Sequence, residues 1–178
     1  MKCIRAFAAL ALLTFFFAGC RREAPPSVAG RWRVAQIEWT QNDQRVKLTA
    51  DGELHMGRFK LPTRPATFEP MIQAMQHITV EVDQTGDELS GRVQADAGAP
   101  AALLREVGAQ PGSLVARFSG SVLNDTLATV LIVAADGRER EAVLNILDRG
   151  GRVVARALPV FGERDADASD VTLIRESS

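Results

Sequence analysis

The side chains best suited to hold a metal ion lie in one short stretch of the chain. Both histidines of the chain and three of its four methionines fall here: His55, Met56, Met71, Met75 and His77. Thioether and imidazole groups are ligands that suit copper. Met71 and Met75 are also one helical turn apart, and flexible methionines often fill gaps in an apolar core. We favour the core interpretation, in which both methionines form the buried face of a short helix, and assign no metal site.

Oxygen ligands near the C-terminus follow the spacing of a calcium-binding loop. Asp165, Asp167, Ser169 and Glu176 occupy positions that carry ligands in an EF-hand loop. The sixth position of such a loop needs glycine for a sharp turn, and here it is Asp170. We therefore expect a solvated acidic turn rather than a calcium site.

The sequence contains no arrangement typical of a catalytic site. A Ser–His–Asp triad would have to use His55 or His77, and no Gly-x-Ser-x-Gly turn is present. A glycine-rich phosphate loop is also absent from the sequence. Carboxylates are scattered over turns and outward strand positions, and nothing pairs them for acid–base work. We expect neither an enzyme nor a cofactor.

Composition argues against a nucleic-acid partner. The chain has 178 residues, with 21 basic and 22 acidic side chains. This balance provides no basic surface for a phosphate backbone. Aromatic residues make up only 6% of the chain and include no tyrosine, so stacking platforms for single strands are not expected. The length suits one domain with a single core.

Alternating apolar and polar residues predict a series of short strands. Two of them, at 78–82 and 89–93, flank the turn Thr85-Gly86-Asp87 and predict a hairpin. Further strands are expected at 32–39, 114–122, 127–135, 143–147, 152–158 and 171–174. The first of these switches parity between Val34 and Ile37, which suggests a β-bulge. Helical spacing appears at 68–76 and, more briefly, at 101–107.

The N-terminal strand opens on a short motif found in a known fold family. Gly30-Arg31-Trp32 resembles the Gly-x-Trp that begins the lipocalins and related calycin barrels. That resemblance implies that Trp32 plugs one end of a barrel and that Arg175, near the end of the last strand, packs across it. The Thr-Asp-Tyr segment of the family is missing. A plain core aromatic remains the alternative for Trp32.

We predict an all-β fold, an antiparallel up-and-down meander closed into a lipocalin-like barrel with one or two short helices. Closure is favoured because sequential hairpins dominate and a barrel leaves no exposed edge. A two-sheet β-sandwich is the alternative. An apolar ligand inside the barrel would contact seven candidate lining residues: Trp32, Val80, Val82, Leu89, Val93, Leu114 and Phe118.

The N-terminus has the order of a secretory signal peptide. Lys2 and Arg5 precede an apolar run at 6–17, which is too short to span a bilayer. Phe17-Ala18-Gly19-Cys20 resembles the lipobox of bacterial lipoproteins, although Phe17 replaces the usual leucine. The resemblance implies cleavage before Cys20 and attachment of lipid to its sulfur. Cys3 would leave with the signal, so the mature domain would contain no disulfide.

These features predict three segments: a signal peptide at 1–19, a lipidated tether at 20–28 and a single β-barrel domain at 29–178. The prolines of the tether favour an extended path that holds the domain away from the membrane. In Gram-negative lipoproteins, Asp after the cysteine often signals retention in the inner membrane. Arg21 stands there instead, and this implies the periplasmic leaflet of the outer membrane.

The sequence thus predicts a lipid-anchored binding or scaffolding protein that faces the periplasm. The first hypothesis is a barrel that holds a small apolar molecule. The second is a filled barrel whose loops bind another envelope protein. The third is copper handling through the histidines and methionines of the 55–77 stretch. Interior volume separates the first two, because ligand sites typically need a few hundred Å³.

Overall fold

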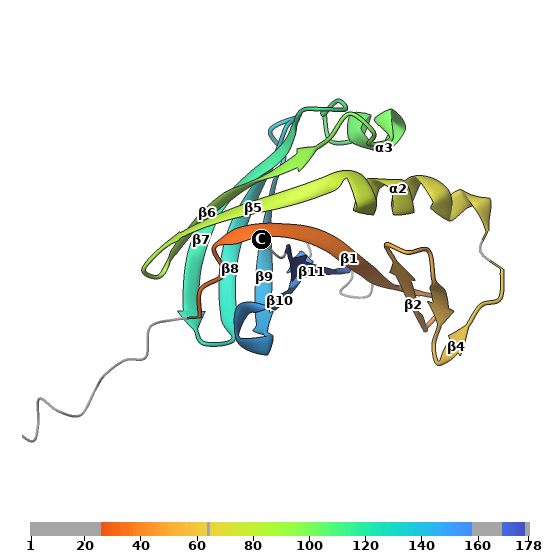
Figure 1. Cartoon of the computed structure of the whole chain (residues 1–178), viewed down its shortest axis with the longest axis horizontal. Helices are drawn as coiled ribbons and strands as arrows, with labels where there is room; N and C mark the ends of the chain where they lie inside the picture. Colours follow the sequence, from red (N-terminus) through yellow and green to blue (C-terminus); the bar gives the residue numbers. More distant parts are fainter. Residues whose placement is uncertain (1–25, 64, 158–168, 177–178) are drawn as a thin grey trace, which may run out of the picture.

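The computed structural model describes residues 26–63, 65–157 and 169–176, and in it eight antiparallel strands close into a barrel (Figure 1). The barrel strands are β1 (Gly30–Gln41), β5 (Ile78–Thr85), β6 (Glu88–Ala95), β7 (Leu114–Asn124), β8 (Leu127–Ala134), β9 (Glu139–Leu147), β10 (Arg152–Ala157) and β11 (Asp170–Arg175). Strands β5 to β11 pair in sequence order, and β1 pairs with both β5 and β11. The closed meander is therefore confirmed, and the sandwich alternative is wrong.

The predicted hairpin and bulge are both present. β5 and β6 pair from Ile78–Ala95 to Thr85–Glu88 around the turn at Gly86. The register between β1 and β11 shifts between Val34 and Gln36. The extra residue turns Ile37 toward a second apolar cluster beyond the end of the barrel.

That second cluster belongs to an extension of the barrel that the sequence analysis missed. The distal half of β1 pairs with β2 (Gln44–Thr49), followed by β3 (Leu54–Met56) and β4 (Phe59–Lys60). Val46 and Leu48 alternate with polar neighbours on β2, and both are buried. This period of two was a usable signal for a strand.

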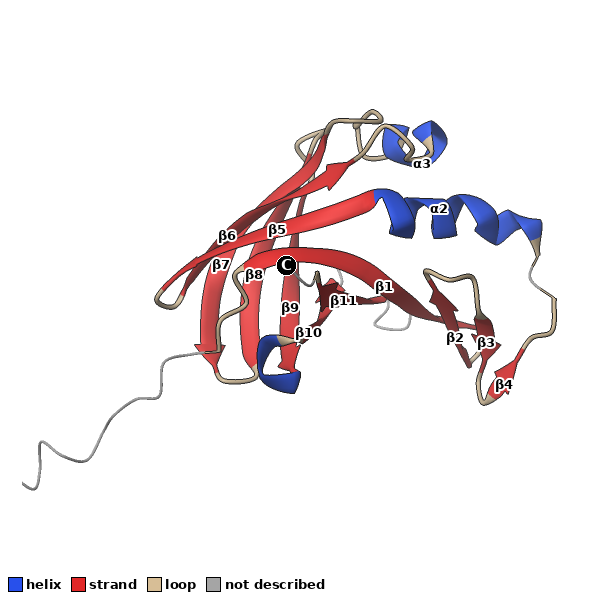
Figure 2. Ribbon diagram, viewed as in Figure 1, coloured by secondary structure: helices blue, strands red, loops and turns tan. Residues whose placement is uncertain are grey.

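The helix α2 (Glu69–His77) covers the extension and then leads directly into β5 (Figure 2). Pro70 lies in its first turn, where a missing N–H is tolerated. Ile72 and Met75 are buried against the extension, with Met71 packed beside them. The predicted helix is confirmed.

A second short helix, α3 (Ala101–Arg105), lies between β6 and β7. Among the described residues, no helix is long and apolar enough to cross a bilayer.

Two glycines allow the barrel wall to bend sharply. A Cβ at Gly91 on β6 would overlap the carbonyl oxygen of Glu81 and the ring of Phe118. A Cβ at Gly120 on β7 would overlap the backbone of Thr129 and Val130. Strand glycines often mark such close approaches at barrel corners. At Gly91, the Phe118 ring from the neighbouring strand takes the space that a side chain would fill.

Candidate functional site

One end of the barrel is closed by the Trp32 side chain, which is 1% exposed. Its Nε1–H donates to the carbonyl oxygen of Val28 at 3.0 Å. The guanidinium carbon of Arg175 lies 5.0 Å from the Trp32 ring centroid, and the same guanidinium donates to the carbonyl oxygen of Ser27. The expected packing of Arg175 across Trp32 is therefore confirmed.

The segment before β1 takes part in this closure. Val28 is buried, and its N–H donates to Oε1 of Gln84 at 2.8 Å. Packing of the barrel therefore begins at Val28, a residue that the sequence analysis placed in the tether.

Inside the barrel an apolar cavity of about 250 Å³ remains. Its lining residues come from all eight barrel strands and from the segment before β1. They are Val28, Trp32, Val34, Ile78, Val80, Val82, Val93, Phe118, Val130, Ile132, Leu144, Val153, Ala155, Val171 and Leu173. No ionisable side chain is among these residues, and the one ring N–H is already bonded to Val28. The cavity therefore offers a ligand shape and apolar surface without a polar group to orient it.

Five of the seven predicted lining residues border this cavity: Trp32, Val80, Val82, Val93 and Phe118. Leu89 is buried in the barrel core but does not border the free volume. Leu114 is also absent from the lining, because the pairing of β6 with β7 shifts register between Val93 and Gln94. Ala116 is paired with Val93 and Leu114 with Gln94, so Val115 is an extra residue without a partner on β6. The alternation that predicted an inward-facing Leu114 therefore does not continue past this bulge.

The lining residues of β8 to β11 were missed by the sequence analysis. Their signal was the alternation within strands that the analysis had already recognised. Val130 and Ile132 share the parity of the buried Ala128, for example. Extending the inward parity to every predicted strand would have found them.

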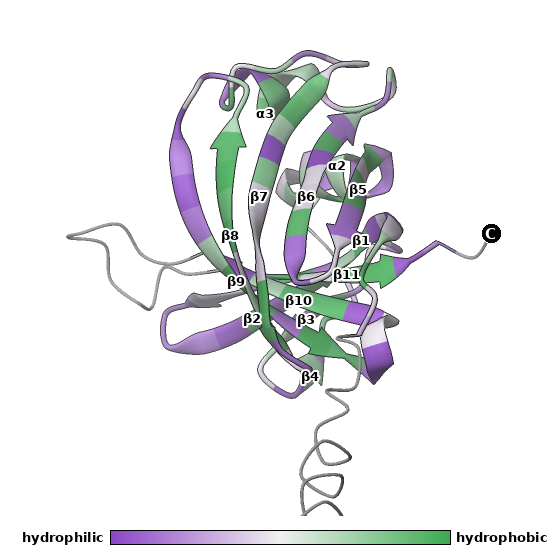
Figure 3. Ribbon diagram, turned by 90° about the vertical axis from the view of Figure 1, so that its left-hand side faces the viewer, coloured by the Kyte–Doolittle hydropathy of each residue, from purple (hydrophilic) through white to green (hydrophobic). Residues whose placement is uncertain are grey.

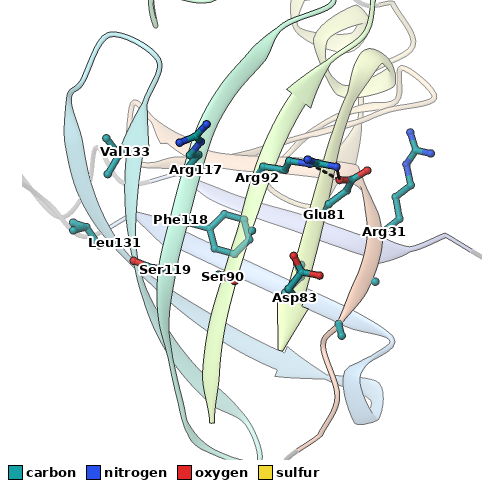
Figure 4. A pocket seen from close by; sticks show the side chains of 14 residues that line it. Arg31, Glu81, Asp83, Ser90, Arg92, Arg117, Phe118, Ser119, Leu131 and Val133 are labelled. Carbon is teal, nitrogen blue, oxygen red and sulfur yellow. Dashed lines mark hydrogen bonds and ion pairs between the residues drawn. The ribbon is translucent and has the colours of Figure 1, made fainter. Parts of the chain in front are cut away.

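A larger hollow of about 790 Å³ lies on the outer wall across β1 and β5 to β8 (Figure 4). One side of this outer trough carries Arg31, Glu81, Arg92 and Arg117, and Glu81 pairs with Arg92 at 2.5 Å. Ser90 and Ser119 form part of the other side. The trough is more open to solvent than the internal cavity, so a ligand in the cavity would lose more of its contact with water.

The residues considered as copper ligands lie in three different environments. Met71 and Met75 pack in the apolar cluster under α2, and Met75 is 2% exposed. His77 Nδ1 lies 3.0 Å from Asp96 Oδ2, and His55 Nε2 lies 3.3 Å from Glu53 Oε2. Met56 is partly exposed on β3.

Hydrogen bonds with these imidazoles affect both carboxyl groups. The His77 imidazole holds the pKa of Asp96 below its usual range. Lys60 first and His55 second lower the pKa of Glu53. Within the described ranges, no group of three or more His, Cys, Asp or Glu side chains is arranged to hold a metal ion.

Several predicted features lie outside the described residues. These are the signal peptide, the lipobox with Cys20, and the Asp165 and Asp167 positions of the calcium-like pattern. Glu176, the last position of that pattern, forms ion pairs with Arg31 at 3.3 Å and Arg33 at 3.4 Å.

Comparisons with known proteins leave the family of this chain open. No family model matches the sequence, and no curated protein matches it. A solved structure described as a de novo design of a fluorescence-activating beta barrel is similar, with 15% sequence identity and a TM-score of 0.40. The similarity covers 83% of this chain and 93% of that chain.

Proposed function

We propose that this chain is a lipid-anchored protein of the cell envelope that holds one small apolar molecule inside its barrel. The cavity beside Trp32 and Phe118 is the observation that carries the proposal. A filled barrel would leave no such volume, so the cavity favours ligand binding over a purely structural interior. The lipobox-like Phe17-Ala18-Gly19-Cys20 supports the anchor and the periplasm-facing location.

The dimensions and lining of the cavity suggest the class of ligand. An apolar cavity of about 150 Å³ in a protein core stays dry and accepts benzene. The volume here, about 250 Å³, suits a molecule the size of benzene with a short alkyl chain. Because the lining residues offer no free polar group, selection would rest on size and apolar surface.

A cavity-filling substitution tests this proposal. Ala155 lines the cavity from β10, and Ala155→Leu places three additional carbon atoms in the free volume. Butylbenzene is expected to raise the thermal unfolding midpoint of the wild-type chain, because a ligand that binds only the folded state stabilises it. The Ala155→Leu chain is expected to unfold at an equal or higher temperature without ligand and to show no response to butylbenzene.

The emission of Trp32 gives a second measurement. A Trp39→Phe background leaves Trp32 as the single reporter, and its spectrum is expected to shift as butylbenzene is added. Leu123→Phe, which enlarges an exposed side chain on β7, is the matched control and should bind like wild type. An unchanged midpoint and an unchanged Trp32 spectrum at saturating butylbenzene would refute ligand binding.

A further inference from the structure

Two neighbouring outward positions of β8 are apolar where a barrel wall normally meets water. Ala128, Val130 and Ile132 face the interior, while Leu131 and Val133 alternate with them and face outward. Leu131 is 38% exposed. Figure 3 shows hydrophobic residues along β8, between strands that carry many polar ones. Leu131 and Val133 therefore form a short apolar strip on the outer wall of the barrel.

Charges of opposite sign flank this apolar strip. Val133 lies directly between Arg117 of β7 and Glu139 of β9, and Leu131 is paired with Glu141 in the next outward row. Directly opposed residues of antiparallel strands point to the same face. In the Val133 row a cation therefore lies on one side of the strip and an anion on the other, whereas Leu131 has Ser119 on its β7 side.

In the part of the chain that the structure describes, these flanking charges have no partners of their own. Arg117, Glu139 and Glu141 are all exposed, and within the described residues none of them forms an ion pair or a side-chain hydrogen bond. In contrast, Arg92 on the next strand pairs with Glu81. Figure 4 shows Arg117 standing beside Val133 on the outer wall, apart from the Arg92–Glu81 pair.

A two-fold rotation makes this pattern complementary to itself. If the two-fold axis runs parallel to β8 between the two copies, each residue keeps its position along the strand direction. The β7 side of one copy then faces the β9 side of the other copy. Arg117 of one copy then faces Glu139 of the second copy, and the same contact forms again across the axis. Leu131 and Val133 meet their own counterparts between two sheets packed about 10 Å apart. Such an interface, with the same patch on both copies, is the commonest kind in homodimers.

We infer that this chain forms a two-fold symmetric homodimer through the outer face of β8. The occupant of the strip is a second copy because one surface carries both signs of charge on opposite sides of an apolar centre. None of the interface residues lines the internal cavity, so the dimer does not depend on ligand binding.

Charge reversal tests the dimer with the full-length chain. Sedimentation equilibrium in a density-matched detergent gives the mass of the protein alone. Wild type is expected to sediment as a monomer–dimer equilibrium. Arg117→Glu and Glu139→Arg are each expected to weaken the dimer by about tenfold or more, since like charges then meet twice across the axis.

Combining the two charge reversals distinguishes a specific Arg117–Glu139 contact from a general loss of association. The double variant Arg117→Glu/Glu139→Arg is expected to recover the dimer, and an equimolar mixture of the two single variants is expected to form a heterodimer. Arg58→Glu, an exposed reversal in the β3–β4 turn, is the matched control and should dimerise like wild type.

Three results would overturn the inference. The first is a wild-type chain that stays monomeric up to the highest concentration measured. The second is a dimer that neither single reversal weakens, which would place the interface elsewhere. The third is loss of the dimer in both single variants without recovery in the double variant and in the mixture.

Discussion

At the closed end of the barrel, the Arg175 side chain joins three parts of the chain. Its guanidinium lies over Trp32 of β1, and it donates to the Ser27 carbonyl before that strand. A cation over an indole ring contributes about 0.5–1 kcal/mol at an exposed site and more when water is excluded. Because Arg175 ends β11, this contact ties the last strand to the first where the barrel closes.

A second contact at the scale of single residues predicts a pH dependence. The His77 imidazole lies against the Asp96 carboxylate, which also accepts a hydrogen bond from the Gly98 N–H, and these two contacts lower the pKa of Asp96 in the folded protein. The carboxylate therefore stabilises the fold at pH values above its unfolded pKa of about 3.9. This contribution is lost as the pH falls through the lower folded value.

Thermal unfolding between pH 6 and pH 3 measures this effect. The midpoint of Asp96→Asn is expected to be lower than that of wild type near neutral pH and to fall less steeply in acid. Asp83→Asn, an exposed carboxyl on β5, is the control. Parallel pH profiles for Asp96→Asn and wild type would contradict the prediction.

At the scale of elements, the seam between β11 and its neighbours depends on one carboxylate. Asp170 is 9% exposed and accepts two hydrogen bonds from Arg156 of β10, at 2.6 and 2.7 Å. Arg45 of β2 reaches the same carboxylate at 3.3 Å and also pairs with Glu38 of β1. Four strands therefore meet through Asp170, and the extension is linked to the barrel.

Asp170→Asn should weaken this seam. The substitution keeps the shape of the side chain but removes the charge that both arginines share. We expect a loss of about 1–2 kcal/mol in the free energy of unfolding, because both guanidinium groups are partly solvated.

Urea unfolding of wild type and variant measures the difference. Asp148→Asn removes an exposed carboxylate that pairs with Arg152 at 3.1 Å, and it should change the stability by less than about 0.5 kcal/mol. Equal losses in the two variants would show that the position of Asp170 at the seam is unimportant.

At the scale of the whole molecule, closure of the barrel separates three surfaces. The first is the interior surface around the apolar cavity, and the second is the outer face of β8 with the proposed dimer contact. The third is the closed end, where the segment that precedes β1 packs beside Trp32. In an extended proline-rich conformation, the stretch from Cys20 to Val28 would span about 25 Å at ~3.1 Å per residue. The lipid that we propose on Cys20 would then lie within about 25 Å of this end of the barrel.

Removing the sulfur that we propose to be acylated tests this arrangement. Cys20→Ala is expected to move the protein from the membrane fraction to the soluble fraction of its host, because two or three acyl chains are needed for stable anchoring. The unfolding midpoint of the domain should be unchanged. A Cys20→Ala protein that stayed in the membrane fraction would contradict the proposed anchor.

Much of the fold follows from local patterns in the sequence. Alternation with a period of two predicts the strands of the barrel meander, because successive side chains on a strand face opposite sides. The parity switch after Val34 predicts the bulge in β1, and the spacing of Met71, Ile72 and Met75 predicts α2. The Gly-x-Trp motif and Arg175 predict the closed end. The extension β2–β4 was missed even though Val46 and Leu48 carry the same alternation.

What the sequence alone determined is therefore the type of the barrel strands and of α2, the inward parity of β5, β6 and most of β7, and the lipobox-like N-terminus. Only the tertiary structure decided how these elements meet. The register shift beside Val115 excludes Leu114 from the cavity lining, and His55 and His77 each face a carboxylate. The cavity itself depends on how side chains from all eight strands fit together. Local periodicity specifies which face a residue takes, but the volume left inside depends on contacts between residues far apart in the chain.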